Sequence, residues 1–511
     1  MPTPRYKPLS AMDTSFLLME DGNVHQHGMG TSIFELGPLK KPAGGIDFDL
    51  VKRFVASVLH LLPRYRQKLA WVPIQNRPVW IDDPDFNLDY HIRHTALPRP
   101  GHDGQLKQLA ARIGAIQLDR ARPLWEMWVV EGLQDDRFAL ISKTHHCMVD
   151  GVSGLDISQV LLSRTPDYEM REAPRYVPHA APSGWDLLRA AVVDRARLPV
   201  HVVRGLQHFR RTTDNVRDEL LVRARAFGEL FTSSAQPAEA TPLNGPLGPH
   251  RRYDWLDLSL GHVRAISKVF NCTVNDVILA TVTGAVRDFL IAHRVHPEDL
   301  DLRAAVPVST RGDAERGELG NRVSSWLVHL PVGEASVRRR VETIRKATEE
   351  LKASRQVLAV EMMMGIAEWT PSVLLALGMR AAGGAANIYV TNMPGPQFPL
   401  YLLGAKLLKM YPQAPLLQNL GLCVAIISYN GNMFWGFHAD YELVPDLRQF
   451  VDMIDTSFRA LAGAAGVNLD RPATEVRALR ADSGAGRPTP KLGRAVPRKA
   501  SLRAKQRKSA V

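Results

Sequence analysis

Helical and strand patterns alternate in two long segments of the chain, and this alternation limits the fold more than any other feature. The first segment covers about residues 1–160 and the second about residues 242–470. Within each, apolar residues recur at helical spacing or in short β-prone runs, which is the pattern of α/β domains. At 511 residues the chain is also longer than one ordinary domain. We therefore predict an α/β fold with two domains, each a mixed β-sheet with helices.

A stretch of different character separates the two segments. Proline and charged residues dominate from about residue 165, and a basic, broken helical pattern follows. We predict an N-terminal domain over 1–184, an interdomain connection over 185–241 and a C-terminal domain over 242–470. The remaining residues, 471–511, are rich in Ala, Arg, Pro and Gly and lack periodicity, which predicts a disordered tail.

Individual elements follow from the same spacing. The predicted helices span 48–62, 105–116, 153–162, 260–270, 274–293 and 335–354. The predicted strands span 124–130, 138–143, 302–308, 387–390, 422–429 and 432–439. The strand at 138–143 leads into a loop and then a helix, so residues in that loop lie at the end of a buried strand.

The positive charge of the chain is concentrated in the predicted tail. Residues 487–508 carry nine Lys or Arg and no acidic residue, out of a formal net charge of +12. Without those nine charges the net charge is +3, so the folded part is close to balanced. This distribution weakens the case for a nucleic-acid-binding fold, and we expect no nucleic-acid partner.

Cysteine usage and hydropathy indicate a cytosolic chain with no metal or disulfide framework. The three cysteines, Cys147, Cys272 and Cys423, are far apart and form no C-x-x-C pair. No apolar run approaches the roughly 18 residues needed to span a bilayer, so we expect any membrane contact to be peripheral. The basic stretch 185–231 has two interpretations: an amphipathic surface on an anionic interface, or a helix packed against both domains, which we favour.

The strongest local feature is the sequence Lys-Thr-His-His-Cys-Met-Val-Asp-Gly-Val-Ser-Gly at residues 143–154. His145 and His146 stand at a strand end and point to opposite faces, which argues against both binding one metal ion. A neutral imidazole can take a proton from a hydroxyl near neutral pH. Asp150 is placed to orient the segment through a charge pair, and Gly151 supplies backbone freedom where the strand gives way to a helix.

Other catalytic patterns are absent from the sequence. Ser153 lies in Gly-Val-Ser-Gly-Leu, which lacks the last glycine of a nucleophile elbow, and Cys147 is expected to face away from His146. No phosphate-binding loop, H-E-x-x-H or dinucleotide fingerprint occurs. Four further histidines show no ligating spacing and are interpreted as ordinary core and surface residues: His25, His27, His91 and His94.

The H-H-x-x-x-D-G sequence resembles the motif of the coenzyme-A-dependent acyltransferase superfamily, which includes chloramphenicol acetyltransferase and peptide-synthetase condensation domains. Further fragments, in the same order and over about residues 5–465, resemble the bacterial wax ester synthase/diacylglycerol acyltransferase family. These fragments are Leu9-Ser-Ala-Met-Asp-Thr-Ser-Phe-Leu17, Pro123-Leu-Trp-Glu-Met-Trp128, Val274-Asn-Asp-Val277, Val306-Pro-Val-Ser309, Leu319-Gly-Asn321 and Asn392-Met-Pro-Gly-Pro396.

The resemblance implies two chloramphenicol-acetyltransferase-like domains with the active-site channel between them. It also implies that His146 is the general base, which removes the proton of an acceptor hydroxyl while the oxygen attacks the thioester of acyl-CoA, without an acyl-enzyme. His145 and Asp150 would support it, and Gly151 would let the backbone turn. No cofactor is implied beyond acyl-CoA as co-substrate.

Weaker candidates come from the other fragments. The resemblance places Asn275 and Asp276 at the channel, with Asn275 as an oxyanion donor, whereas a helix N-cap at Thr273 or Asn275 is an equal alternative. Trp125 either shapes the acyl or acceptor tunnel or is a core residue, and we favour the core. Arg311 either pairs with Asp150 or is an ordinary surface residue, which we favour.

The expected partners are acyl-CoA and either diacylglycerol or a long-chain alcohol. Both products are nearly insoluble, so we expect a cytoplasmic protein peripherally associated with the inner membrane or with lipid droplets. The sequence predicts no oligomeric state. Two rival functions stay open: a non-catalytic lipid-droplet or membrane-surface protein that keeps the fold, and a thioesterase or other hydrolase.

Overall fold

The computed structural model describes most of the chain up to residue 471. The described residues are 6–73, 77–148, 157–170, 172, 174–187, 189, 237–309, 323–353, 373, 376, 377, 380 and 384–471. Residues 1–469 form one compact unit and residues 470–511 a second. Most of the predicted connection 185–241 and nearly all of the predicted tail 471–511 therefore lie outside the described residues.

The first of two six-stranded sheets contains strands from both ends of the compact unit. Its order is β12-β13-β2-β7-β6-β5, and all neighbours are antiparallel except the parallel pair β5 and β6. Its strands are β2 (His27–Glu35), β5 (Ile92–Ala96), β6 (Trp125–Leu133), β7 (Arg137–His145), β12 (Tyr401–Leu402) and β13 (Ala405–Gln413).

The second six-stranded sheet is also mixed. Its order is β10-β9-β11-β14-β15-β8, with parallel pairing of β11 to both β9 and β14. Its strands are β8 (Arg251–Ser259), β9 (Leu302–Ser309), β10 (Val323–Leu330), β11 (Ile388–Pro394), β14 (Leu422–Tyr429) and β15 (Asn432–Asp440). A three-stranded antiparallel sheet is formed by β1 (Lys7–Pro8), β4 (Arg77–Asp82) and β3 (Gln67–Val72).

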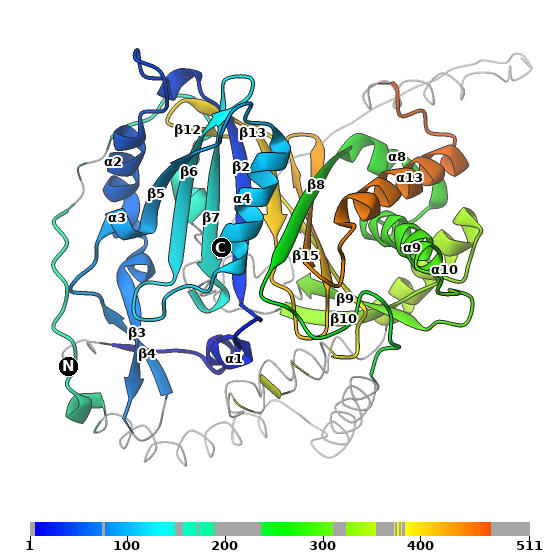
Figure 1. Cartoon of the computed structure of the whole chain (residues 1–511), viewed down its shortest axis with the longest axis horizontal. Coiled ribbons are helices and arrows are strands. Elements are labelled where there is room, and N and C mark those ends of the chain that lie inside the picture. The colour runs from blue at the N-terminus through cyan, green and yellow to red at the C-terminus, as the bar shows by residue number, and fades with distance from the viewer. Residues whose placement is uncertain are drawn as a thin grey trace, which may run out of the picture. The chain divides into compact units, whose positions relative to one another are not determined.

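Helices cover the sheets, and several of them begin after an N-cap residue whose side chain accepts a backbone N–H of the first turn. Four helices, α8, α9, α10 and α13, lie together beside the second sheet (Figure 1). The α-helices with described bounds are α1 (Ala11–Met19), α2 (Phe48–Val58), α3 (Leu88–His91), α4 (Asp103–Ala115), α5 (Ile157–Leu161), α8 (Leu260–Phe270), α9 (Val274–Ala292), α10 (Val337–Ala353) and α13 (Leu447–Ala465).

Strand β13 links the two sheets. It pairs along its length with β2 of the first sheet, although it follows β11 of the second sheet in sequence. Tyr411 of β13 stacks on Trp255 of β8 with ring centroids 4.5 Å apart, and the Tyr411 hydroxyl donates to Asp257 at 2.6 Å. A Cβ added at Gly436 of β15 would lie 1.9 Å from the carbonyl oxygen of Pro412. Only a glycine permits this close approach of the two backbones.

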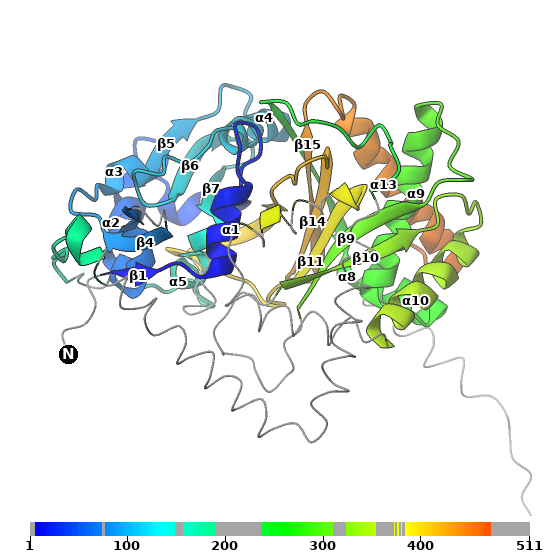
Figure 2. The same ribbon diagram turned by 90° about the horizontal axis from the view of Figure 1, so that it is seen from below.

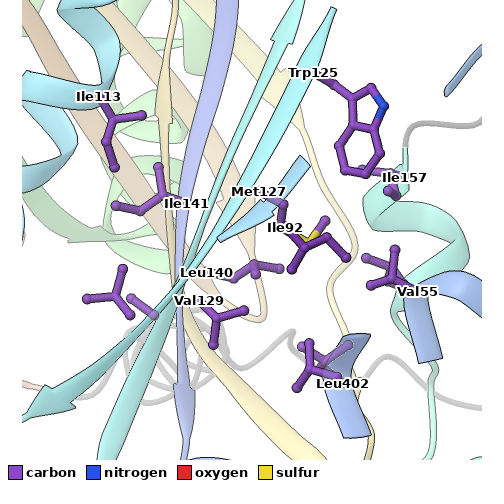
Figure 3. Close-up of a cluster of buried hydrophobic side chains, with 14 of the residues drawn as sticks. Val55, Ile92, Ile113, Trp125, Met127, Val129, Leu140, Ile141, Ile157 and Leu402 are labelled. Atoms are coloured by element: carbon purple, nitrogen blue, oxygen red, sulfur yellow. The ribbon is translucent and has the colours of Figure 1, made fainter. Parts of the chain in front are cut away.

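Each six-stranded sheet has its own apolar core. In the first, Val55 of α2, Trp125 of β6, Ile157 of α5 and Leu402 of β12 belong to one buried cluster, although they come from distant parts of the chain (Figure 3). The second core is formed mainly by the apolar faces of α9 and α13 against β14 and β15. Burial of such side chains, each worth about 1.5–3 kcal/mol, is the main force that holds these layers together.

The predicted fold class is confirmed: the chain forms mixed sheets with helices in a two-domain arrangement. Among the elements, the predicted strands at 422–429 and 432–439 match β14 and β15 closely, and the predicted helix at 274–293 matches α9. The predicted helix at 48–62 stops as an α-helix at Val58 and continues as a 3-10 turn over Leu59–Leu61.

No single helix among the described residues is both long and apolar enough to cross a membrane. Helices α8 and α9, which meet at 96°, pass such a test only as a bent pair on length and composition. Most residues of α9 are buried in the second core.

Candidate active site

The paired histidines stand at the end of β7, a strand held on both sides by β2 and β6. His145 is the last residue of the strand, and a 3-10 turn starts at His146 (His146–Met148). Helix α1 contacts this turn, and Figure 2 shows α1 close to the end of β7. The position of the turn is therefore set by two strand pairings and one helix.

Lys143 anchors the same strand to α4. Its side chain is 1% exposed, and its ammonium donates to the carbonyl oxygens of Ile113, at 3.0 Å, and Ile116. A cation at the carboxyl end of a helix interacts favourably with the helix dipole and the unpaired carbonyl groups. Burial lowers the pKa of Lys143 to about 8.

His145 faces the interior. Its Nδ1 accepts the backbone N–H of Cys147 at 3.1 Å, which leaves Nε2 as the donor nitrogen of the ring. Nε2 lies 3.1 Å from Oε1 of Glu20, close enough for charge attraction although the N–H is not aligned for a hydrogen bond. His145 thus ties the turn that follows β7 to a buried carboxylate.

Glu20 is the centre of a polar cluster behind the histidine pair. Its side chain is 1% exposed, and its carboxylate accepts the backbone N–H of Gln26 at 2.7 Å and the Arg120 guanidinium at 2.7 Å. Gln117 donates to it at 3.0 Å, and His27 Nε2 lies 3.5 Å away. Buried carboxylates are retained where several donors compensate their lost hydration, as they do in this cluster.

The charge of Glu20 persists at neutral pH. Burial by itself would raise the pKa of the Glu20 carboxyl, but its contacts with His145 and Arg120 outweigh burial and hold that pKa well below its usual range. His27, in contrast, is held neutral, because burial and the nearby Lys143 and His145 lower its pKa well below the ordinary value. The cluster therefore pairs one carboxylate with one partly exposed guanidinium and with imidazoles.

His146 occupies a different environment from His145. Its backbone N–H donates to the carbonyl of Gln26 at 2.8 Å, and its ring stacks on Phe16 of α1 with centroids 5.4 Å apart. The residue is half-buried. Burial, followed by the neighbouring His145, lowers the pKa of His146 to about 4. The ring is therefore neutral near pH 7 and able to accept a proton.

Gly28 of β2 lies beside the His146 ring. A Cβ added at this position would be 3.9 Å from Nε2 of His146, in ordinary van der Waals contact. A larger side chain at residue 28 would therefore extend over the Nε2 edge of the ring. The edge of the imidazole that carries Nε2 faces a strand with no side chain at that point.

The second group of candidate residues lies at the start of α9, in the part of the unit that carries the second sheet. Thr273 is the N-cap, and Asp276 completes a capping box by accepting the Thr273 N–H at 2.7 Å. Asp276 also accepts the hydroxyl of Thr348 at 2.7 Å and is 1% exposed. Asn275 is not the N-cap; it is exposed, and its Oδ1 accepts Nδ2 of Asn392 at 2.7 Å.

The hydrogen bond between Asn275 and Asn392 joins two of the family-like fragments, and it leaves Nδ2 as the donor end of Asn275. The buried carboxylate of Asp276 has a helix-capping function in this structure.

Trp125 is a core residue: its indole N–H donates to the Tyr65 carbonyl at 2.8 Å, and its ring stacks on His91. Three further candidates lie outside the described residues: Asp150, Gly151 and Arg311.

Sequence reasoning misses the support behind His145. It interprets His27 as an ordinary histidine and does not single out Glu20 or Arg120, although all three belong to the polar cluster. The available signal is Glu20 itself, an acidic residue at the end of the short apolar run Phe16-Leu-Leu-Met. Within the described residues, no group of three or more His, Cys, Asp or Glu is arranged to hold a metal ion.

Comparison with solved structures first identifies the fold. The first condensation domain of the CDA synthetase matches with a TM-score of 0.55 at 15% identity, covering 93% of this chain and 99% of that domain. At this identity the likeness concerns the fold alone. The two-domain α/β architecture of this chain is thus shared with condensation domains.

The particular family follows from closer matches. The wax ester synthase/diacylglycerol acyltransferase catalytic domain matches residues 9–278, and the WS/DGAT C-terminal domain matches residues 319–462. A probable diacylglycerol O-acyltransferase of Mycobacterium tuberculosis is 33% identical over 89% of this chain and 95% of its own length. The wax ester synthase/diacylglycerol acyltransferase of Marinobacter aquaeolei matches with a TM-score of 0.63 at 27% identity, covering 90% of this chain and 100% of that one.

The chain belongs to the wax ester synthase/diacylglycerol acyltransferase family and is an acyltransferase.

Proposed function

We propose that this acyltransferase moves a long-chain acyl group from acyl-CoA to the hydroxyl of diacylglycerol, of a long-chain alcohol, or of both. His146 acts as the general base. The observation that carries the proposal is the state of His146, a half-buried residue whose neutral imidazole is fixed through its backbone and ring at the end of β7. A neutral base positioned in this way typically contributes roughly 10²–10⁴ in rate.

The chemistry proceeds in one transfer. The acceptor oxygen attacks the thioester carbon as its proton passes to Nε2 of His146, which adjoins the open position of Gly28. The carbon–sulfur bond then breaks, and the coenzyme A thiolate takes the proton back from the imidazolium. Triacylglycerol or wax ester and free coenzyme A are the products, and His146 returns to its neutral form.

A covalent route through Cys147 is disfavoured. The side chain is fully buried, and burial together with the nearby carboxylates Asp13 and Glu20 raises the pKa of this thiol well above its usual value. A protonated, buried thiol is a poor nucleophile, because the thiolate is the reactive form. Direct transfer without an acyl-enzyme therefore fits the described residues better.

Asn275 is the proposed donor to the oxyanion of the tetrahedral intermediate. Its Oδ1 is occupied by Asn392, so the amide is oriented with Nδ2 as its donor end. Loss of one oxyanion donor costs about 2.7–4 kcal/mol in comparable enzymes. Asn275→Asp keeps the shape of the side chain and removes the donor, so turnover should fall roughly 10²-fold or more while folding is retained.

The test of the function is coenzyme A release by the purified full-length protein from palmitoyl-CoA, with hexadecanol and dioleoylglycerol offered separately. We expect release that requires an acceptor and falls to background in His146→Ala. His179→Ala, which removes an exposed histidine paired with Asp82, is the matched control and should retain wild-type turnover.

Each other outcome contradicts a part of the proposal. More than about a tenth of wild-type turnover in His146→Ala would contradict the base assignment. Release without an acceptor would identify a thioesterase. No release with either acceptor, from a folded protein, would favour the non-catalytic lipid-surface role.

The proposed place of action is the cytoplasmic face of the inner membrane or the surface of lipid droplets, because the acceptors reside there. The nine Lys and Arg residues of 487–508 would each contribute about 1 kcal/mol next to an anionic leaflet. Deletion of 471–511 should then reduce flotation with anionic liposomes. Unchanged flotation would remove the tail from the proposal.

A further inference from the structure

A small, partly enclosed cavity lies where the two sheets meet. It is close to the Glu20 cluster but is lined by different atoms, and it brings together β2, β13, β15 and the end of α4. The residues that line it are His25, His27, Met29, Gly114, Arg251, Gln413, Pro415, Leu416 and His438. The space corresponds to about one water molecule.

The lining contains buried polar atoms with no hydrogen-bond partner among the described residues. These atoms are Nδ1 of His25, Nδ1 of His27, Nε2 of His438 and both amide atoms of Gln413. His27, His438 and Gln413 are 4%, 6% and 2% exposed, respectively, and His25 is partly buried. An unsatisfied buried polar group destabilises the folded state, so a cluster of five such atoms around one cavity indicates a bound polar species.

In His27 and His438, the hydrogen-bonding role of the unpartnered ring nitrogen follows from the contact that the other nitrogen of the same ring makes. Nε2 of His27 accepts the backbone N–H of Leu118 at 3.4 Å, so Nδ1 carries the proton and is a donor. Nδ1 of His438 lies 2.8 Å from the Ala414 carbonyl and donates to it, so Nε2 is an acceptor. Burial lowers the pKa of both rings, that of His438 to about 3, which keeps both neutral at pH 7.

Gln413 adds one donor and one acceptor. Its amide is pressed against the backbone of Gly114, where an added Cβ would lie 2.5 Å from Nε2. Besides Nδ1 of His25, the cavity therefore presents two donors, from His27 and Gln413, and two acceptors, from His438 and Gln413. A ligand that satisfies these atoms must both donate and accept hydrogen bonds within the volume of about one water.

We infer that this cavity is a binding site for one ordered water molecule, held by His27, Gln413 and His438. Water is the small species with two donors and two acceptors, and buried waters usually make about three such bonds. An anion would meet the lone pairs of His438 and of the Gln413 carbonyl. A cation would meet the N–H groups of His27 and Gln413.

The positive charge of Arg251 does not alter this assignment. Its guanidinium donates to the carbonyl oxygens of Asn23, Gly248 and His250 and lies 3.5 Å from Asp440, whose side chain is 1% exposed. The charge is thus compensated by a buried carboxylate and three carbonyl groups. Little of it remains to attract an anion into the cavity.

The water would connect the second sheet to the polar cluster around Glu20, which lies behind the histidine pair. It would bridge β13 and β15 to His27, whose opposite ring nitrogen lies 3.5 Å from Glu20. This inference does not depend on the proposed reaction, because it concerns atoms that hold the two sheets together.

The first experiment is a high-resolution crystal structure of the full-length protein, from crystals soaked in bromide and measured at the bromine absorption edge. We expect one density peak about 2.7–3.2 Å from His438 Nε2 and the Gln413 amide, without anomalous signal. Anomalous density in the cavity would assign an anion, and an empty cavity would also overturn the inference.

A solution experiment uses Gln413→Met, which keeps the side-chain length and removes both amide partners. Oxygen-17 relaxation dispersion should count one long-lived internal water fewer than in the wild type, and the thermal midpoint should fall. Gln108→Met, at an exposed position of α4, is the control and should change neither quantity. An unchanged water count in Gln413→Met would overturn the site; if that variant fails to fold, the crystal measurement on the wild type decides.

Discussion

Replacing Glu20 with glutamine tests whether a buried negative charge supports the histidine pair. Glutamine has nearly the same shape, but its amide nitrogen must face either the Gln26 N–H or the donors of Arg120 and Gln117. In each orientation a donor meets a donor. The substitution therefore removes the charge and at least one hydrogen bond without creating a cavity.

The magnitude follows from the partners. Removing one member of a buried ion pair costs about 3–5 kcal/mol. Arg120 is 34% exposed and can be rehydrated, which reduces the loss, so we expect about 2–4 kcal/mol. Activity should fall as well, because Glu20 holds the Gln26 N–H while the Gln26 carbonyl holds the backbone of His146. A shift of about 1 Å in a catalytic group can cost roughly 10²-fold.

The assay is urea unfolding followed by tryptophan fluorescence, together with coenzyme A release. Glu35→Gln, at an exposed position near the other end of β2, is the control and should change stability by less than about 0.5 kcal/mol. A loss below about 1 kcal/mol in Glu20→Gln, with turnover near wild type, would refute the reasoning.

The same comparison also predicts how the stability difference between wild type and Glu20→Gln changes with pH. Because the folded-state pKa of Glu20 is lowered, its stabilising contribution is present above the unfolded value of about 4.3 and is lost as pH falls through the folded value. The difference in unfolding free energy between wild type and Glu20→Gln should therefore shrink as pH falls below about 4. A difference that grows in acid would contradict the ionised state of Glu20.

Three further outcomes are expected. Since the pKa of His146 is about 4, kcat/KM should stay level from neutral pH to about 5 and decline below it, whereas a decline centred near 6.5 in a pH–rate profile would contradict the neutral ring. Gly436→Ala should lower unfolding stability by about 1–3 kcal/mol or more through its clash with the Pro412 carbonyl, while Gly22→Ala, with open space around it, should be nearly neutral in the same urea titration. Lys143→Met leaves two carbonyl groups at the end of α4 without their donor and should cost about 1–3 kcal/mol; an unchanged urea midpoint would show that this anchor is dispensable.

Elements with strong local signals could be predicted from the sequence. The apolar runs at 422–429 and 432–439 match β14 and β15, because a fully buried strand needs apolar side chains on both faces. Helix α9 has both an apolar pattern and a capping box, and its predicted start is correct. In α4 the predicted start is two residues late, since His102 is an unusual N-cap.

Strands β2 and β13 are missed by sequence reasoning for a different reason. The segment His27–Glu35 contains two glycines among mixed residues, and Ala405–Gln413 contains two lysines and a proline. Neither has a strong strand pattern, and each is a strand mainly because it pairs with the other, nearly 400 residues away in sequence. Local propensity carries no information about such long-range pairing.

The candidate site likewise has one part that local sequence predicts and one part that depends on long-range contacts. The histidine pair is contiguous and could be identified directly, but its support comes from residues 20, 26, 27, 117 and 120, which the fold brings together from two segments. The roles proposed for Asn275 and His146 remain predictions, and so do those of Asp150, Gly151 and the substrate channel. Asp276 shows how a family fragment can also serve the helix, because its carboxylate is bonded to Thr273 and Thr348.

The pairing of β13 with β2 also affects how the protein is made. When β2, β6 and β7 leave the ribosome, the edge of β2 that β13 later covers has unpaired N–H and C=O groups. At synthesis rates of about 5–20 residues per second, β13 follows β7 only after tens of seconds. An open strand edge is a template for pairing with other chains, so nascent copies on one messenger would be exposed to each other during this interval. Fragments that end before Ala405 would keep that edge permanently, and attempts to express the amino-terminal half alone should give aggregated protein.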